Sequence, residues 1–234
     1  MTEQFLDPLA LTPEVVVIGA GVLAIGLTEA LVRQGITDDL VVTDPGRIDP
    51  TIFPRPGVAS TAGAALAQHL RSIDPAGPTR VRSMKHWTEL DAVRPRLTVV
   101  ATPTAEPDRA ITEHLTRRDL THLVIRLEPS RVRIGPLVVP GRTPCLACTD
   151  AVLTEAEPAW PGSLLQRSGV TVTDGPVGLV DWGVAVAAVQ AHAYLQRGSA
   201  DTLGCTLELG WDEPVTRVRR WPRHPDCGCA WWLI

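Results

Sequence analysis

The fold is decided by the segment Glu14-Val-Val-Val-Ile-Gly-Ala-Gly-Val-Leu-Ala24. Residues 14–18 form the kind of apolar run that is typical of a strand covered on both faces. After the glycines, apolar residues repeat at helical spacing as far as Gly35. A GxGxxG/A turn between a strand and a helix brings phosphate groups close to backbone amides. We therefore predict a nucleotide-binding type of turn, with Gly19, Gly21 and Ala24 at its defining positions.

An acidic residue follows the second expected strand, which covers residues 40–43. Asp44 comes 25 residues after Gly19, close to the position where such folds place an acid that binds a ribose hydroxyl. The turn and Asp44 fit NAD as well as ATP, and they also fit a scaffold that holds no nucleotide. This region therefore predicts the fold more firmly than the ligand.

The rest of the chain supplies the other elements of an α/β domain. The patterns favour strands at 79–82, 97–101 and 122–127, with helices at 59–72 and 106–118. Past residue 130 they favour a strand pair or bent strand at 131–139, a loop at 156–176, a helix at 177–196 and a hairpin of strands at 203–210 and 215–221. We expect a Rossmann-like, mostly parallel sheet with an antiparallel C-terminal extension.

Composition narrows the classes of partner. The formal net charge is −4 and the isoelectric point is about 5.9, which argues against nucleic acid or an anionic membrane as the main partner. The sequence has no apolar stretch of bilayer-spanning length, and residues 1–13 lack the pattern of a secretory signal. We expect a cytoplasmic protein, whose cysteines are ligands or buried thiols rather than disulfides.

Four of the five cysteines form two close pairs. Two residues separate Cys145 from Cys148, and a single glycine separates Cys227 from Cys229. Two such pairs can supply four thiolates to a tetrahedral ion, which leaves no open position for substrate. We predict a structural zinc site that ties the middle of the chain to its end. An iron–sulfur cluster or redox cysteines are the alternatives, while Cys205 is expected to be a buried thiol.

Together these segments resemble a known family. The glycine turn, Asp44, the run Ile134-Gly-Pro-Leu-Val-Val-Pro-Gly-Arg-Thr-Pro-Cys-Leu-Ala-Cys148, the segment 157–161 and the ending His224-Pro-Asp-Cys-Gly-Cys229 are similar to the ThiF/MoeB/HesA (ubiquitin-activating-like) family. The similarity is greatest to actinobacterial ThiF-like proteins associated with azoline-forming cyclodehydratases in bacteriocin and other ribosomal peptide biosynthesis. It covers nearly the whole chain. Active members bind ATP and magnesium and adenylate the C-terminal carboxylate of a carrier protein.

Three catalytic elements that the resemblance implies are altered in this chain. Residues 49–55 stand where the family has Asn-Leu-x-Arg-Gln, and only Arg55 remains of its character. The expected helix at 59–72 contains no lysine, since Lys85 is the only lysine of the chain, and residues 101–104 replace the expected aspartate. Loss of these cationic and metal-binding groups should cost several powers of ten in rate. Arg47 and Arg55 could still hold phosphate.

We therefore interpret the chain as one ThiF-like domain, residues 1–234, with a nucleotide-binding half (14–127) and a zinc-binding, dimerising half (128–234). The favoured function is a pseudoenzyme, a binding or scaffold partner of a peptide or protein in ribosomal peptide modification, acting as a homodimer or heteromer. The alternatives are an active ATP-dependent adenylyltransferase and a dinucleotide-binding oxidoreductase. Trp231 and Trp232 are candidates for burial in a dimer or partner contact.

Overall fold

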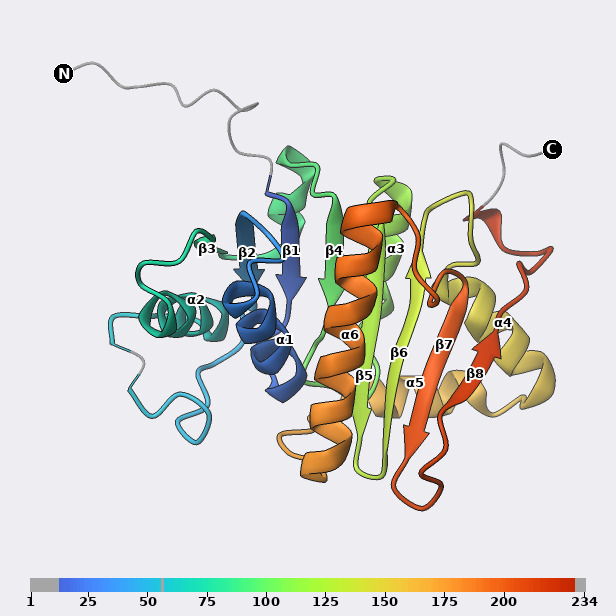
Figure 1. Ribbon diagram of the computed structural model, residues 1–234. Coiled ribbons are helices and arrows are strands. Elements are labelled where there is room, and N and C mark those ends of the chain that lie inside the picture. Colours follow the sequence, from blue (N-terminus) through green and yellow to red (C-terminus); the bar gives the residue numbers. More distant parts are fainter. Residues whose placement is uncertain (1–12, 56, 230–234) are drawn as a thin grey trace.

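The computed structural model describes residues 13–55 and 57–229, and Figure 1 shows helices on both faces of one twisted sheet. The strands are β1 (Val15–Ile18), β2 (Asp39–Thr43), β3 (Arg80–Met84), β4 (Leu97–Val100), β5 (His122–Glu128), β6 (Arg131–Val138), β7 (Cys205–Gly210) and β8 (Arg217–Arg220). The helices are α1 (Val22–Arg33), α2 (Ala62–Ile73), a 3-10 helix (Trp87–Ala92), α3 (Arg109–Arg117), α4 (Leu146–Ala156), α5 (Trp160–Ser168) and α6 (Val177–Arg197).

The strand order is β3-β2-β1-β4-β5-β6-β7-β8. The first five strands in this order are parallel to their neighbours, and β6, β7 and β8 are added antiparallel. The order reverses at β1, from which the chain goes first to β2 and later to β4. In such sheets ligands bind beyond the carboxyl ends of the strands at this switch point. The expected fold class, a mostly parallel sheet with an antiparallel extension, is confirmed.

The sheet separates two apolar cores. On one face, Val15 and Val17 of β1 pack in a cluster with Leu27 of α1 and Leu66 of α2, and α6 closes the same layer. On the other face, Ile18 belongs to a second cluster with side chains from α3 and α4 that include Cys145 and Cys148. The two faces alternate along β1 because successive side chains of a strand point in opposite directions. The cysteines of α4 are therefore built into the second core.

The longest helix, α6, spans 21 residues and ends at Gly198, whose φ of +65° suits a left-handed helix cap. It lies along β5 and β6 in Figure 1 and packs against α1. No helix within the described part of the chain is both long and apolar enough to cross a membrane.

The sequence interpretation is wrong for residues 156–176, where a loop was expected. Helix α5 occupies Trp160–Ser168, and α4, which was not foreseen, precedes it. Pro161 stands in the first turn of α5, where a proline is tolerated because the missing amide has no helical partner there. The expected strand pair or bent strand at 131–139 is the single strand β6.

His122, at the start of β5, should make stability depend on pH. The side chain is fully buried, and burial lowers its pKa to about 4 from 6.5. Below about pH 6.5 this histidine is protonated in the unfolded chain but stays neutral in the folded chain. The free energy of unfolding therefore falls by about 3 kcal/mol between pH 6.5 and 4. We expect the stability difference between wild type and His122→Asn, measured by urea unfolding, to shrink over that interval. Replacement of the exposed His192 should leave the pH profile unchanged, and an unchanged difference for His122→Asn would contradict the assignment.

Candidate metal centre and nucleotide-type pocket

The glycine-rich turn follows β1 and lies tightly against the loop after β4. Gly19 has a φ of +124°, and a Cβ atom at this position would come within 2.1 Å of the Ala101 carbonyl oxygen. Gly21 is the N-cap of α1, and a Cβ on it would lie 3.0 Å from the Cβ of Pro103. The two glycines are therefore required by close approach of the 101–104 loop, whether or not a nucleotide binds.

Two cavities border Gly21 at the N-terminus of α1. The smaller one measures about 10 Å³, and Pro103 and Val172 contribute to its walls. Val172 donates its amide to the Pro103 carbonyl oxygen at 2.7 Å, and Ala105 donates to the Val170 carbonyl oxygen at 3.0 Å. These bonds hold the segment after α5 against the loop after β4. This smaller cavity has about the volume of one water probe, so it is too small for a phosphate group.

A larger cavity of about 250 Å³ lies beside Asp44 and is also lined by Arg47 and Phe53. The Gly46 amide donates to the Asp44 carboxylate at 2.8 Å. Burial raises the pKa of Asp44, although this amide and a backbone bond at Ala20 act in the opposite direction. The pocket can therefore receive a small polar group such as a ribose hydroxyl at the Asp44 carboxylate.

The other residues of the predicted nucleotide site lie elsewhere. Ala24 is completely buried in the core between α1 and the sheet, which matches the packing role of the third position of the motif. Arg55 is exposed and is not part of the pocket lining. The structure thus brings Gly21, Asp44 and Arg47 to one cavity and leaves Ala24 and Arg55 outside it.

The loop after β4 carries hydroxyl groups where the resemblance implies a carboxylate. Thr102 and Thr104 form a hydrogen bond between their hydroxyl oxygens at 2.9 Å. Thr104 also donates to the backbone carbonyl oxygen of Glu106 at 2.7 Å. These hydroxyls stabilise the loop itself and supply no negative charge for magnesium, which prefers carboxylate and phosphate oxygens.

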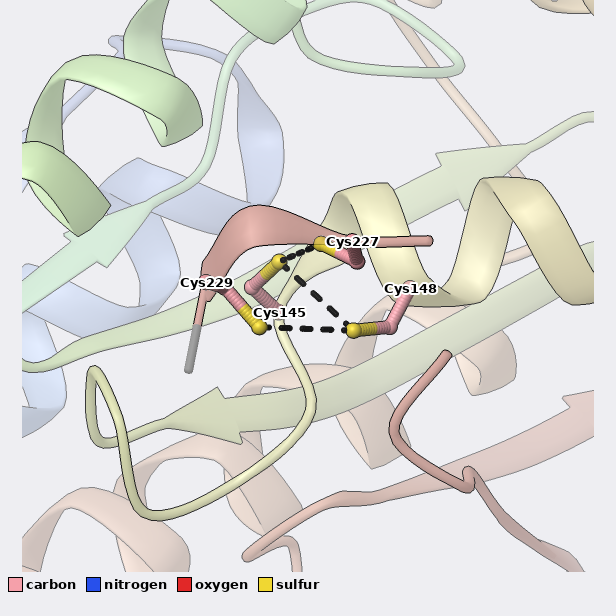
Figure 2. Close-up of side chains that lie close together, drawn as sticks. All are labelled: Cys145, Cys148, Cys227 and Cys229. Carbon is pink, nitrogen blue, oxygen red and sulfur yellow. Dashed lines mark hydrogen bonds between the residues drawn. The ribbon is translucent and has the colours of Figure 1, made fainter. Parts of the chain in front are cut away.

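The four cysteines meet in the second core, and their predicted meeting is thus confirmed. Cys145 is the N-cap of α4 and Cys148 lies in its first turn, while Cys227 and Cys229 come from the segment after β8. Figure 2 shows all four sulfur atoms directed at one another. The Sγ–Sγ distances are 3.9 Å for Cys145–Cys148, 3.5 Å for Cys145–Cys227 and 3.5 Å for Cys148–Cys229.

This arrangement fits a tetrahedral metal ion. All four sulfur atoms lie within 4.8 Å of one another, and a Zn–S bond of about 2.3 Å requires sulfur atoms about 3.8 Å apart. A hydrogen bond from the Cys145 thiol lowers the pKa of Cys148 to about 4, while that same contact and burial raise the pKa of Cys145, and burial raises the pKa of Cys229 to about 11, so a bound cation would be needed to hold all four as thiolates. A thiolate is the form of cysteine that binds metal. Since four protein ligands complete the tetrahedron, the ion would hold the fold together rather than react.

Further contacts fix the segment that carries the second cysteine pair. His224 pairs with Glu155 of α4 at 2.9 Å and so lies beside the cluster rather than in it. Arg223 donates to the Gly141 carbonyl oxygen at 2.8 Å, and the Trp221 indole donates to the Thr206 hydroxyl at 2.8 Å. Cys205 is buried at the start of β7, as expected, and stays outside the cluster. Trp231 and Trp232 lie outside the described residues.

A buried network of charges was not foreseen from the sequence. Glu106 is completely buried and accepts hydrogen bonds from Arg126 at 3.0 Å and from Arg109 at 3.0 Å. Arg109 also binds Asp150 of α4 at 2.7 Å, and Arg167 of α5 contacts Glu128 at 2.6 Å. Glu106 lies in a loop six residues after β4, where no repeating sequence pattern marks it. The contacts among these charged groups are therefore visible only in the structure. The network joins the loop after β4 to α3, α4 and α5.

Comparison with solved structures identifies the same architecture in other proteins. Escherichia coli MccB with ATP superimposes with a TM-score of 0.70 at 17% identity, covering 93% of this chain. MccB described as a microcin C7 biosynthetic enzyme in complex with N-formylated MccA gives 0.70 at 18% identity over 93% of this chain and 67% of the other. PaaA gives 0.64 at 12% identity over 88% of this chain and 72% of that one.

The likeness is one of fold, since identity is below 20% throughout these matches. The chain spans 66% of the length of the ATP-bound MccB chain. No model of a protein family matches the sequence, and no curated protein matches it. The resemblance noted from the sequence is thus supported at the level of fold alone: the chain has the fold that is seen in MccB.

Proposed function

We propose that this protein is a non-adenylating ThiF-like protein, held together by zinc, that binds a peptide or protein partner in ribosomal peptide modification. The observation that carries the proposal is the absence of the charged groups that adenylation needs: the sequence of α2 contains no lysine, and the loop after β4 holds Thr102 and Thr104, bonded to each other, where the resemblance implies a carboxylate. The MccB-like fold, in a protein described as a microcin C7 biosynthetic enzyme, supports the pathway.

Nucleotide assays test this proposal. We expect no pyrophosphate release when the protein is incubated with ATP, magnesium and a carrier peptide. In calorimetry, ATP should bind no more tightly than adenosine, because the lysine and the carboxylate that would bind its phosphates and magnesium are missing from α2 and from the loop after β4. Asp44→Asn should weaken any adenosine binding, whereas Asp201→Asn, on an exposed loop, should not.

Three results would separate the alternatives. Pyrophosphate release that depends on Asp44 would overturn the proposal and favour an adenylyltransferase in which arginines replace the lysine. Saturable binding of NADH, followed by its fluorescence, would favour the dinucleotide-binding oxidoreductase. ATP binding much tighter than adenosine binding would show that the cavity lined by Gly21 and Arg47 holds phosphates, and it would count against the proposal.

The antiparallel extension offers a surface for a partner. Helix α6 lies over β5 and β6, while β7 and β8 extend beyond it in Figure 1. Val218 of β8 pairs with Leu207 of β7, which packs toward the α6 core, so both point to this face. Val218 is 58% exposed and Trp211 is 60% exposed. A largely exposed tryptophan is a frequent interface anchor, and we propose that a second copy of the chain covers both side chains.

The proposed dimer predicts a change of mass on mutation. Trp211→Arg would place a charge in the centre of the contact, so the dimer should dissociate to monomers in light scattering. Leu165→Arg is the control, because Leu165 is 77% exposed but lies on α5. A wild-type monomer at tens of micromolar would exclude the homodimer and would leave a different protein as the partner.

A further inference from the structure

Strand β8 forms the outer edge of the antiparallel side of the sheet (Figure 1), and all its residues are exposed. The Trp221 amide donates to the Gly204 carbonyl oxygen at 2.9 Å, and Arg220 lies opposite Cys205. Hydrogen-bonded and non-hydrogen-bonded pairs alternate along an antiparallel ladder, so the backbone groups of Val218 and Arg220 point away from β7. Among the residues that the structure describes, no backbone group outside the sheet bonds to them. Their amides and carbonyls are therefore available to a further strand.

This edge carries positive charge, although the whole chain has a formal net charge of −4. Arg217 pairs with Glu213 at 2.6 Å, whereas Arg219 and Arg220 form no salt bridge within the described part of the chain. The Arg219 guanidinium lies over the Trp221 ring, 4.0 Å from its centroid. Stacking fixes the plane of the guanidinium and leaves its N–H groups free for a carboxylate. Because successive side chains of a strand point to opposite faces, the two free arginines flank the edge on both faces of the sheet.

An extended peptide adds to a free sheet edge through main-chain hydrogen bonds, and its side chains supply the specificity. We propose that β8 binds an acidic, extended segment of the partner as an additional antiparallel strand. Carboxylates opposite Arg219 and Arg220 form charge-assisted hydrogen bonds with them. An apolar side chain opposite Val218 covers that exposed valine. This inference rests on the peptide or protein partner of the proposed function, and it adds the place and the chemistry of the contact.

A second copy of the chain does not fit the same edge. If two β8 strands paired antiparallel through their outward backbone groups, Val218 or Arg220 of one copy would lie opposite Val218 or Arg220 of the other. Each of these registers places an arginine directly opposite an arginine, because three of the four residues of β8 are arginines. Like charges in that position are destabilising. The edge therefore favours an acidic segment, while the proposed dimer uses Trp211 and the Val218 side chain on the α6 face.

Calorimetry with a synthetic peptide at low salt tests the proposal. The probe is a blocked Thr-Val-Glu-Glu-Val-Thr-Ser peptide, whose glutamates would lie opposite Arg220 and Arg219 and whose second valine would lie opposite Val218. It should bind at least about tenfold more tightly than the same peptide with glutamines. Arg219→Glu combined with Arg220→Glu should lose this binding and should instead bind the peptide with lysines. Arg197→Glu, exposed at the end of α6, is the control and should bind like wild type.

Backbone changes separate strand addition from simple attraction of charge. Val218→Pro removes an outward amide and leaves the bonds to β7 intact, since an edge strand tolerates proline where the amide faces away from the sheet. It should weaken binding by about tenfold, while Val218→Thr should keep it. N-methylation of the peptide's second valine should act like Val218→Pro. N-methylation of its second glutamate, whose amide faces away from β8, should have little effect.

Each outcome decides the question. If the glutamate peptide binds neither wild type nor the Trp211→Arg variant, the proposal is wrong. Binding that ignores both Val218→Pro and N-methylation would also overturn it, because charge alone would then be responsible. Binding to Trp211→Arg but not to wild type would assign the edge to a second copy. If Val218→Pro fails to fold, the two N-methylated peptides decide alone. The pyrophosphate assay does not involve β8, so this inference and the proposed function can fail separately.

Discussion

Cys148→Ser is expected to release the metal ion and to lower the melting temperature by about 10 °C or more. Cys148 is completely buried in the second core, and its sulfur lies 3.5 Å from that of Cys229. Without this ligand the metal ion would no longer connect the segment after β8 to α4. Binding of a structural ion contributes directly to folding free energy, so the loss should appear in thermal unfolding. Elemental analysis should find about one zinc per wild-type chain and none in the variant.

Cys205→Ser is the matched control. Cys205 is also buried and undergoes the same atomic change, but it lies outside the cluster. It should keep its metal and most of its stability. Excess chelator should make the wild type behave like Cys148→Ser, and it should have little further effect on the variant. Wild-type protein that is folded and metal-free would show that the four thiols need no ion, while visible absorption with bound iron would favour the iron–sulfur alternative.

The parallel half of the sheet and the cysteine cluster were predictable because their signals are local. A run of apolar residues such as 14–18 already describes a strand buried on both faces, and the glycine turn needs only neighbouring residues. The two cysteine pairs are distant in sequence, yet each pair shows the short spacing that chelation needs. The meeting of the pairs in one cluster then follows from the chemistry of the ligands.

Long-range packing was not predictable in the same way. The glycine motif gives no sign that Pro103 and Val172 lie against Gly21, since Val172 is far along the chain and its amide meets the Pro103 carbonyl oxygen only in the folded protein. Helix α5 was missed because residues 156–176 contain three prolines, of which only Pro161 lies in the helix. The division into a nucleotide-binding half and a dimerising half remains a prediction.

Glu106→Gln is expected to destabilise the protein by about 3–5 kcal/mol. Burial alone would raise the pKa of Glu106, but Arg126 and Arg109 outweigh it and hold the pKa below its ordinary value. The carboxylate is therefore charged in the folded protein. Its replacement leaves Arg126, whose side chain is 7% exposed, without its balancing charge. Urea unfolding at pH 7 measures the loss.

Glu113→Gln is the control, because Glu113 pairs with Arg117 at 3.2 Å on the solvent-exposed side of α3. An exposed pair contributes about 0–1 kcal/mol, so this variant should stay close to wild type. The pH dependence gives a second check. Since the folded pKa of Glu106 is lowered, its stabilisation is present above the unfolded pKa and is lost as the pH falls through the folded pKa. Glu106→Gln should lack that part of the acid destabilisation.

A double variant shows whether the buried charges of Glu106 and Arg126 only stabilise the protein or also hold the loop after β4 against the glycine turn. Replacing Glu106 and Arg126 together by leucine and methionine should recover much of the stability, because apolar pairs often replace buried ion pairs well. The Glu106 backbone accepts from Thr104 and donates to the Arg167 carbonyl oxygen, so these contacts survive the change. If the loop after β4 then stays closed, the double variant should still fail to bind ATP more tightly than adenosine. ATP binding gained by the stable double variant would instead show that the buried charges keep Pro103 against the turn.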